Sequence, residues 1–183
     1  MSMIGAMKKK KSERSDSVVE FIRYKRGRLY DRRNSCYASL KEVEALAIQR
    51  VPFRITLAPT HNDITLFTLC QILLKRMATG QMQPSVAQLN HVLECPVVDP
   101  SRPATRVIRY TSNRRLYHQN HRRYCTLGEI EALVLAGTPV QITMHPDKTD
   151  VTAFTLCQIL AQRVGRGELH PRLDQMLALF QGS

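Results

Sequence analysis

The chain repeats itself, and this repeat constrains the fold more than any other feature of the 183-residue sequence. The hexapeptide TLCQIL occurs at residues 68–73 and again at residues 155–160. Tyr24 likewise corresponds to Tyr110, although the second copy carries one extra residue shortly after this tyrosine. A duplication that covers most of a chain predicts two similar structural units in tandem.

Composition shifts divide the chain further. Three prolines and few apolar residues between positions 94 and 106 indicate a semi-extended linker. Four consecutive lysines in an apolar-poor N-terminal stretch predict a disordered basic tail. The predicted organisation is a tail (residues 1–20), a first unit (21–93), a linker (94–106) and a second unit (107–183). We expect each unit to fold alone, and one core shared by both copies is the alternative.

Each copy begins with basic residues that alternate with apolar or aromatic ones. Over residues 22–24 and 28–30 this period of two predicts a strand with one solvent-exposed face. A polar turn follows at residues 32–35, and residues 37–40 are the predicted returning strand of a β-hairpin. The second copy repeats the turn at residues 119–122 and the returning strand at residues 124–127.

Helices and further strands follow in the same order in both copies. Ser39 with Glu42, and Thr126 with Glu129, form S/T-x-x-E capping boxes, each of which predicts the start of a short helix, and Gly137 ends the second of these helices. A strand is predicted next in each copy (53–57 and 140–144), followed by a turn at Pro59 or Pro146 and a short strand (63–65 and 150–152). A helix with a long apolar stripe then follows (66–77 and 153–164), and a short helix ends each copy (86–93 and 173–180). The predicted fold class is therefore α+β, a tandem repeat of a small unit with a basic β-hairpin, short strands and two to three helices.

The charge points to a polyanionic partner. Lys and Arg total 27 against 15 for Asp and Glu, a net charge of +12, and the basic residues cluster in the hairpins. Arginines contact phosphates or guanine edges, and a two-stranded ribbon fits the major groove of DNA, whereas a solvated basic hairpin without a ligand is the alternative. The candidate DNA-binding residues are Arg23, Lys25, Arg26, Arg28, Arg32, Arg33, Arg109, Asn113, Arg114, Arg115, Arg122 and Arg123.

Other chemistry is weakly indicated. All six tyrosines lie in the hairpins, where they either stack on bases or, as we favour for most of them, pack across strands. His118, His121 and Cys125 have a spacing that suits a metal, but the first copy has Asp31, Asn34 and Ala38 there, so we predict no metal site. Cys70 and Cys157 lie on the apolar stripes and are predicted to be inert core thiols. We predict no cofactor and no enzyme, because no phosphate loop, nucleophile elbow or carboxylate pair occurs.

The location follows from similar observations. Five cysteines without a C-x-x-C pair favour a reducing compartment, and no stretch resembles a signal peptide or a membrane span. The expected location is the cytoplasm, with no membrane partner.

The hairpin motifs resemble those of a known bacterial family. N-R-R-L-Y, a turn and Y-x-T-L, followed by D-x-T and L-x-Q-I, are similar to the DNA-binding domain of polyhydroxyalkanoate (polyhydroxybutyrate) accumulation regulators. The second copy matches at Tyr110, Asn113, Arg114, Arg115, Leu116, Tyr117, Tyr124, Thr126, Leu127, Asp150, Thr152, Leu156, Gln158 and Ile159. The first copy matches at Tyr24, Arg28, Leu29, Tyr30, Asp31, Tyr37, Leu40, Asp63, Thr65, Leu69, Gln71 and Ile72, and departs at Gly27, where the family has Asn.

The resemblance implies a DNA-binding transcriptional regulator, specifically a repressor of polyhydroxyalkanoate storage metabolism that binds duplex DNA. It also implies the surface of the polymer granule as a second partner. Two alternatives stay open: a granule- or protein-binding module without DNA binding, and an RNA-binding regulator. The duplication favours an internal pseudo-dimer, with a larger oligomer left open, and its 13-residue linker spans at most about 43–47 Å, enough for half-sites one DNA turn apart.

Overall fold

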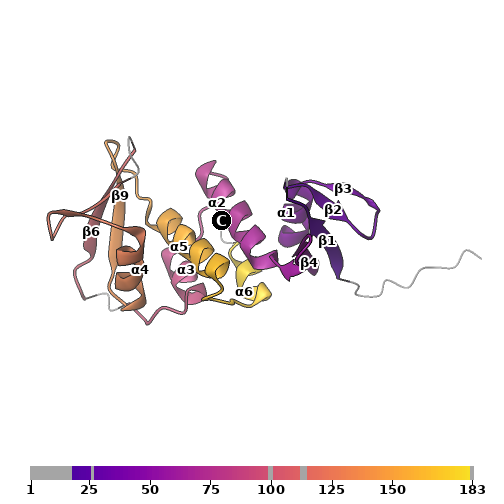
Figure 1. Ribbon diagram of the computed structural model, residues 1–183. Coiled ribbons are helices and arrows are strands. Elements are labelled where there is room, and N and C mark those ends of the chain that lie inside the picture. Colours follow the sequence, from indigo (N-terminus) through magenta and orange to yellow (C-terminus); the bar gives the residue numbers. More distant parts are fainter. Residues whose placement is uncertain (1–17, 26, 99–100, 112–114, 182–183) are drawn as a thin grey trace, which may run out of the picture.

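The computed structural model describes residues 18–25, 27–98, 101–111 and 115–181. The predicted α+β class is confirmed: two similar sheets lie toward opposite ends of the molecule, and helices fill the space between them (Figure 1). In the described part of the chain no helix is both long and apolar enough to cross a membrane.

The elements of the first copy are β1 (Val19–Arg23), β2 (Leu29–Asp31), β3 (Cys36–Ala38), α1 (Leu40–Ile48), β4 (Phe53–Leu57), β5 (Asn62–Asp63), α2 (Thr65–Ala78) and α3 (Val86–Val92). Its strands form a five-stranded sheet with the order β3-β2-β1-β4-β5. Strand β1 pairs in parallel with β4, and the other neighbours are antiparallel.

The second copy repeats this arrangement with one strand fewer, in the order β8-β7-β6-β9. A single bridge between Thr143 and Asp150 stands where the first copy has β5. The elements are β6 (Thr105–Tyr110), β7 (Leu116–His118), β8 (Arg123–Cys125), α4 (Leu127–Leu135), β9 (Val140–His145), α5 (Thr152–Arg166) and α6 (Leu173–Ala178).

The prediction of one strand through residues 22–30 was wrong, because this segment forms two strands, β1 and β2. The turn between them is closed by the amide of Gly27, which donates to the carbonyl of Tyr24 at 2.8 Å. Gly27 has φ +77°, a left-handed conformation that glycine adopts without steric cost. Each copy therefore has a three-stranded antiparallel ribbon rather than a two-stranded hairpin.

The D-x-T motif ties the sheet to the long helix in both copies. Asp63 accepts a hydrogen bond from the amide of Thr65 (2.9 Å), and the Thr65 hydroxyl accepts one from the amide of Ile55 on β4 (2.8 Å). Asp150 and Thr152 make the same bonds at 2.8 and 2.9 Å. The motif satisfies amides that would otherwise lack partners where the long helix begins beside the parallel strand.

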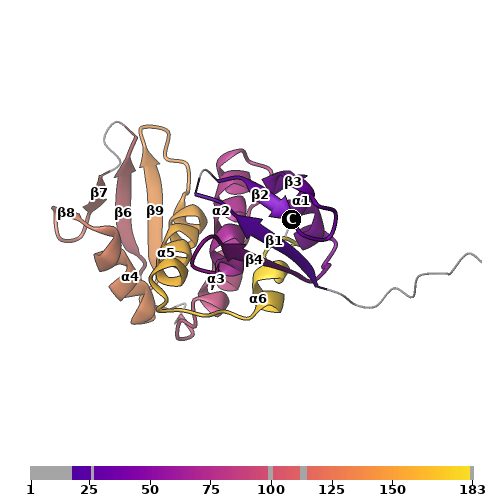
Figure 2. The same cartoon turned by 45° about the vertical axis from the view of Figure 1, so that its right-hand side comes forward.

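The two copies share one hydrophobic core. Helices α2 and α5 are equivalent in the two copies, and they make the most extensive helix–helix contact in the molecule (Figure 2). Cys70 and Cys157 are buried at equivalent positions on these helices, and burial raises the pKa of the Cys70 thiol to about 12. A thiol with so high a pKa is protonated at neutral pH and therefore unreactive, as predicted.

The last helix of each copy packs against the long helix of the other copy. Helix α3 of the first copy packs on α5, and α6 of the second copy packs on α2. The carbonyl of Leu93, which follows α3, accepts a hydrogen bond from Arg163 of α5 at 3.4 Å. Arg50 of the first copy correspondingly donates to Gln181, beyond α6. This exchange favours the shared core over two units that fold alone.

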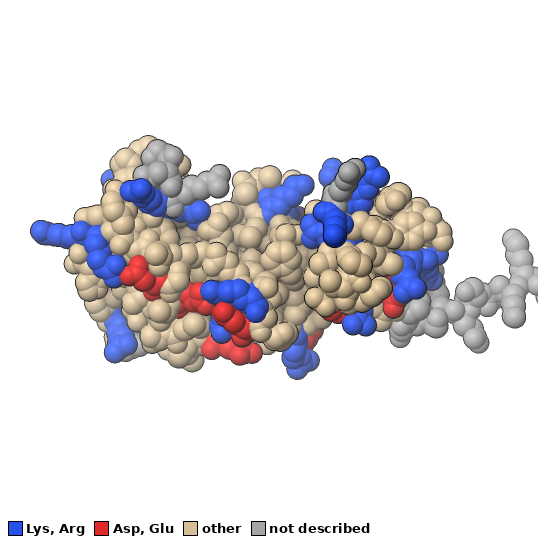
Figure 3. Space-filling view, in the orientation of Figure 1, with Lys and Arg blue, Asp and Glu red and all other residues tan. Residues whose placement is uncertain are grey.

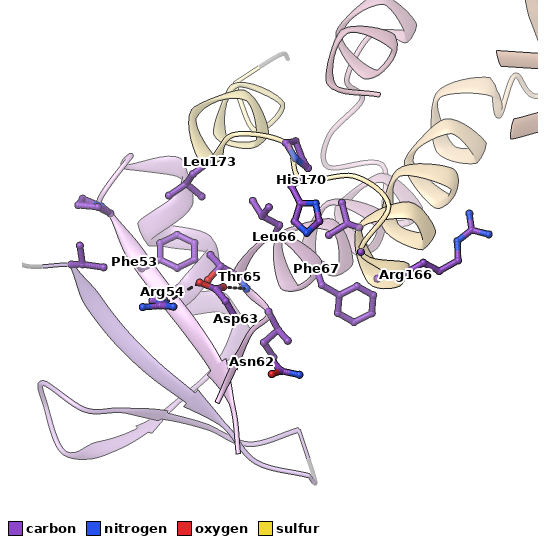
Figure 4. Close-up of a pocket in the computed structure, with 17 residues that line it drawn as sticks. Phe53, Arg54, Asn62, Asp63, Thr65, Leu66, Phe67, Arg166, His170 and Leu173 are labelled. Carbon is purple, nitrogen blue, oxygen red and sulfur yellow. Dashed lines mark hydrogen bonds and ion pairs between the residues drawn. The ribbon is translucent and has the colours of Figure 1, made fainter. Parts of the chain in front are cut away.

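A cavity of about 980 Å³ marks the border between the copies near α6. It is lined by first-copy residues such as Phe53 and Phe67 and by second-copy residues such as His170 and Leu173 (Figure 4). A β-carbon added at Gly165 of α5 would lie 3.1 Å from the Phe67 ring, so glycine permits the close approach of α5 to α2.

The contact of the linker with the second copy leads to a stability prediction. Gly137 and Gly80 share left-handed φ values of +71° and +70°, but only a β-carbon at Gly137 would meet a neighbour, Pro96 at 3.3 Å. We expect Gly80→Ala to cost about 1 kcal/mol through backbone strain alone, and Gly137→Ala to cost more because Pro96 must also move. Urea unfolding of both variants measures the difference, and equal losses would mean that Pro96 yields without cost.

Candidate nucleic-acid interface

Strand pairing places one row of side chains across the helix-free face of each sheet. In the first copy the pairs Tyr37–Tyr30, Tyr30–Ile22 and Ile22–Thr56 set this row. In the second copy the register aligns Tyr124, Tyr117, Ile108 and Thr143 in the same way. The neighbouring residues Phe21 and Val107 are buried on the opposite face, against the helices, so the tyrosine row lies on the uncovered side.

Within the described residues the candidate basic residues fall into three groups, of which the first points toward the helices. Arg23 donates to Gln71 of α2 at 2.8 Å, and Arg109 donates to Gln158 of α5 at 2.7 Å. Both arginines are half-buried, and Gln71 and Gln158 are the glutamines of the two TLCQIL segments. These contacts make Arg23 and Arg109 anchors of the sheet on its helix. The repetition of glutamine in both hexapeptides was the available signal for this role.

The second group lies at the exposed edge of the three-stranded ribbons. The guanidinium of Arg28 lies 5.8 Å from the centre of the Tyr37 ring, and that of Arg115 lies 5.4 Å from Tyr124. Lys25 precedes Arg28 in the exposed turn after β1. Each copy thus presents a cation held over an aromatic ring at the same place.

Further basic residues occupy the turns between the second and third strands. Arg33 and Arg122 are exposed there. Arg32 pairs with Glu20 at 2.9 Å, and Arg123, the first residue of β8, pairs with Glu129 at 2.6 Å. The acidic partners, which sequence reasoning did not identify, reduce the charge that Arg32 and Arg123 present to a ligand. Arg26, Asn113 and Arg114 lie outside the described residues.

The tyrosines combine the two roles that were considered for them. Tyr30 and Tyr37 pack edge to face at 5.7 Å, and Tyr117 and Tyr124 do so at 5.5 Å. Nevertheless, Tyr37 keeps 64% of its surface exposed, and Tyr124 keeps 53%. The rings therefore pack across strands and still offer aromatic surface to a ligand.

Acidic side chains are confined to part of the face drawn in Figure 3. Lys and Arg side chains appear both along the upper edge of this face and in its lower half, whereas the visible Asp and Glu side chains lie in the lower half only. A surface that is basic without nearby acidic groups attracts polyanions from a distance.

The turn between the second and third strands differs between the copies. In the first copy Asp31 accepts hydrogen bonds from the amides of Arg33 and Asn34 at 2.8 and 3.0 Å. Burial opposes ionisation, but these bonds outweigh it and hold the pKa of Asp31 below its usual value. In the second copy His118 replaces Asp31, and its Nδ1 accepts from the amide of His121 at 3.3 Å.

His118 should make the protein sensitive to mild acid. Burial lowers the pKa of His118, the charges of His121 and Arg123 lower it further, and Glu129 opposes them. The unfolded chain then binds the proton more tightly than the folded one. His118 therefore costs no stability above about pH 6.5, and it lowers the free energy of unfolding as the pH drops below that value. We expect His118→Asp, which installs the first copy's residue, to reduce this loss of stability below about pH 6.5.

Denaturant unfolding at several pH values measures the effect. His61→Asp makes the same substitution in an exposed turn of the first copy and is the matched control. An unchanged loss of stability in His118→Asp would show that another group takes up the proton.

Comparison with known proteins agrees with this geometry. The PHB/PHA accumulation regulator DNA-binding domain matches the chain twice, over residues 21–80 and 107–167. An uncharacterized protein of Allochromatium vinosum is 33% identical over 63 residues, which cover 34% of this chain and 41% of that relative. No solved structure matches the chain. Because the two matches together cover more than half of the sequence, the chain belongs to the family of PHB/PHA accumulation regulator DNA-binding domains and carries that domain twice.

Proposed function

We propose that the protein is a cytoplasmic transcriptional repressor of polyhydroxyalkanoate storage genes, and that it binds duplex DNA through the ribbons of both copies. One observation carries the proposal: in both sheets exposed basic side chains lie before and after the second strand of the ribbon, and Arg28 and Arg115 occupy equivalent positions. In the described part of the chain these are Lys25, Arg28 and Arg33 in the first copy and Arg115 and Arg122 in the second. Family membership supports DNA over other polyanions.

The scaffold supports binding at two half-sites. The contact between the equivalent helices α2 and α5, with α3 packed on α5 and α6 packed on α2, supports an isologous arrangement of the copies, like that of two subunits in a dimer. DNA-binding dimers place their reading elements on half-sites about 34–36 Å apart, one turn of DNA. The packing of α2 on α5, rather than the linker, would set this separation here. We infer that the internal pseudo-dimer binds an approximately palindromic operator.

The anchors and the exposed cations would have different roles. Arg23 and Arg109 would keep each sheet oriented on its helix, whereas Lys25, Arg28 and Arg115 would contact phosphates or base edges. Half or more of protein–DNA hydrogen bonds go to the backbone, so most of these contacts would position the protein rather than read sequence.

A granule surface as the main partner is the second candidate, and it has less support. Large exposed aliphatic residues in the described chain include Val18, Ile48, Val86 and Val97, which belong to four separate segments. A polymer surface would favour a contiguous apolar patch instead. The polymer granule therefore remains a proposed additional partner of a DNA-binding protein.

A salt titration tests the proposal. We expect the protein to shift duplex fragments from storage-gene promoters, with log affinity falling against log salt at a slope of about −0.9 for each phosphate neutralised. Five contacts correspond to a slope of about −4 to −5. Single-stranded RNA in the same titration addresses the RNA-binding alternative. A flat salt response, or tighter binding to RNA than to every duplex, would contradict the proposal.

A further inference from the structure

A shallow cradle opens on the helix-free face of the first copy, where β1 ends. Its volume is about 490 Å³, within the range of small-ligand sites. It is lined by two tyrosines, two basic residues and the turn after β4, namely Tyr24, Tyr37, Lys25, Arg28, Ala58 and Pro59.

The tyrosine rings of the cradle are available to a ligand. Tyr24 is 43% exposed and Tyr37 is 64% exposed. Tyr30 supports Tyr37 from the side, edge to face at 5.7 Å, so the Tyr37 ring is held in place although it is exposed. An exposed and supported ring is suited to stacking against another flat group, and the Arg28 guanidinium, 5.8 Å from the centre of the same ring, would then lie beside the bound nucleotide.

The charges of the cradle favour an anion. Lys25 and Arg28 both line it, and none of the lining residues that the structure describes is Asp or Glu. A ligand that complements two cations and two aromatic rings is flat, aromatic and negatively charged. A nucleotide with its base out of the helical stack has these properties, whereas the bases of an intact duplex cannot present their faces to a tyrosine ring.

The second copy provides an internal comparison. His145 and Pro146 stand where the first copy has Ala58 and Pro59. The His145 ring lies 5.1 Å from the ring of Tyr110, the counterpart of Tyr24, and Tyr110 lies 6.5 Å from Tyr124. The aromatic groups of the second copy thus contact one another. In the first copy Ala58 stands in place of His145 and has no ring to contact Tyr24.

We propose that the first-copy cradle binds one unpaired nucleotide, with the base on Tyr24 and Tyr37 and the phosphate on Lys25 and Arg28. This proposal rests on the proposed function, since it takes the ribbon face as the side that meets nucleic acid. In this proposal the two copies differ in function: both ribbons bind duplex DNA, and only the first also binds an unstacked base.

Exchanging Ala58 and His145, the equivalent turn residues of the two copies, tests the proposal in the full-length protein. Ala58→His imports the residue of the second copy before the same proline, so the turn should tolerate it. Anisotropy measurements would use labelled oligothymidylate of about ten nucleotides, oligouridylate of the same length, and an operator duplex. We expect Ala58→His to weaken oligothymidylate binding about tenfold, the effect of losing one base–aromatic stack, and to leave duplex affinity within about twofold.

Two further variants sharpen the test. Tyr37→Ala should also lose about tenfold in oligothymidylate affinity, and the reverse exchange His145→Ala should strengthen single-strand binding. The oligouridylate arm separates RNA from DNA as the source of the nucleotide. Wild-type oligothymidylate affinity in both Ala58→His and Tyr37→Ala would overturn the cradle.

The two proposals fail in distinguishable ways. If the protein binds duplex but no single strand, the cradle is refuted and the proposed function stands. If it binds single strands in a manner that Ala58→His abolishes, but binds no duplex, the cradle stands and the duplex regulator is refuted.

Discussion

Cutting the chain between residues 98 and 99 and isolating the halves should leave neither half as a folded monomer. The first half would keep α3 without α5, and the second would keep α6 without α2, although these pairs pack together in the intact protein. In the first half Leu89, Val92 and Leu93, which are at most 3% exposed, would lose their cover. At about 1.5–3 kcal/mol for each large apolar side chain, this loss is about 5–9 kcal/mol, comparable with the whole stability of a typical domain.

Size-exclusion chromatography with light scattering, together with thermal melts followed by circular dichroism, measures the result. Each half alone should lack a cooperative melt or should self-associate, because its exposed helix face fits a copy of itself. Mixing the halves should restore a single melt and a one-to-one complex. A half that is monomeric and melts cooperatively would show that the units fold independently, as the linker composition had suggested.

Local features of the sequence predicted much of the fold. The capping boxes at Ser39 and Thr126 form and begin α1 and α4, and the predicted strand 53–57 is β4. The apolar stripes predicted α2 and α5, whose buried faces form the centre of the core. These signals succeed because caps and periodicity act over a few residues.

Contacts between residues far apart in the sequence could not be predicted from local patterns. The alternating pattern in residues 22–30 indicates an extended chain, but it does not show that β1 pairs in parallel with β4 or that a turn at Gly27 divides the segment. The exchange of α3 and α6 depends on contacts between the copies, which no local pattern reports. The linker likewise suggested two tethered units, whereas the packing of α2 on α5 determines how they lie.

The candidate site shows the same division. The clustering of basic residues in the sequence placed them in the ribbon segments, but it did not distinguish arginines that face helices from those that face solvent. Arg23 and Gln71 are 48 residues apart in sequence, and their hydrogen bond assigns Arg23 a structural contact. Glu20 and Glu129 similarly pair with Arg32 and Arg123, which had been included among the candidate DNA-binding residues.

The exposed ribbon cations should dominate DNA affinity. A variant with Lys25, Arg28, Arg33, Arg115 and Arg122 replaced by Gln lowers the formal charge from +12 to +7. A closely matched control lowers it to +8 through exposed residues outside the ribbons, at Lys41, Lys75, Arg102 and Arg172. If each ribbon cation neutralises one phosphate, the ribbon variant should lose at least about 100-fold in duplex affinity, and its salt slope should become shallower by about 4.

The most direct test measures both variants and the wild type by anisotropy on one promoter duplex, across a salt series. We expect the ribbon variant to show the large loss and the shallower slope, while the control stays within about fivefold of the wild type with its slope reduced by less than about 1. Equal losses in the two variants would contradict binding through the ribbons, because affinity would then follow net charge wherever it lies.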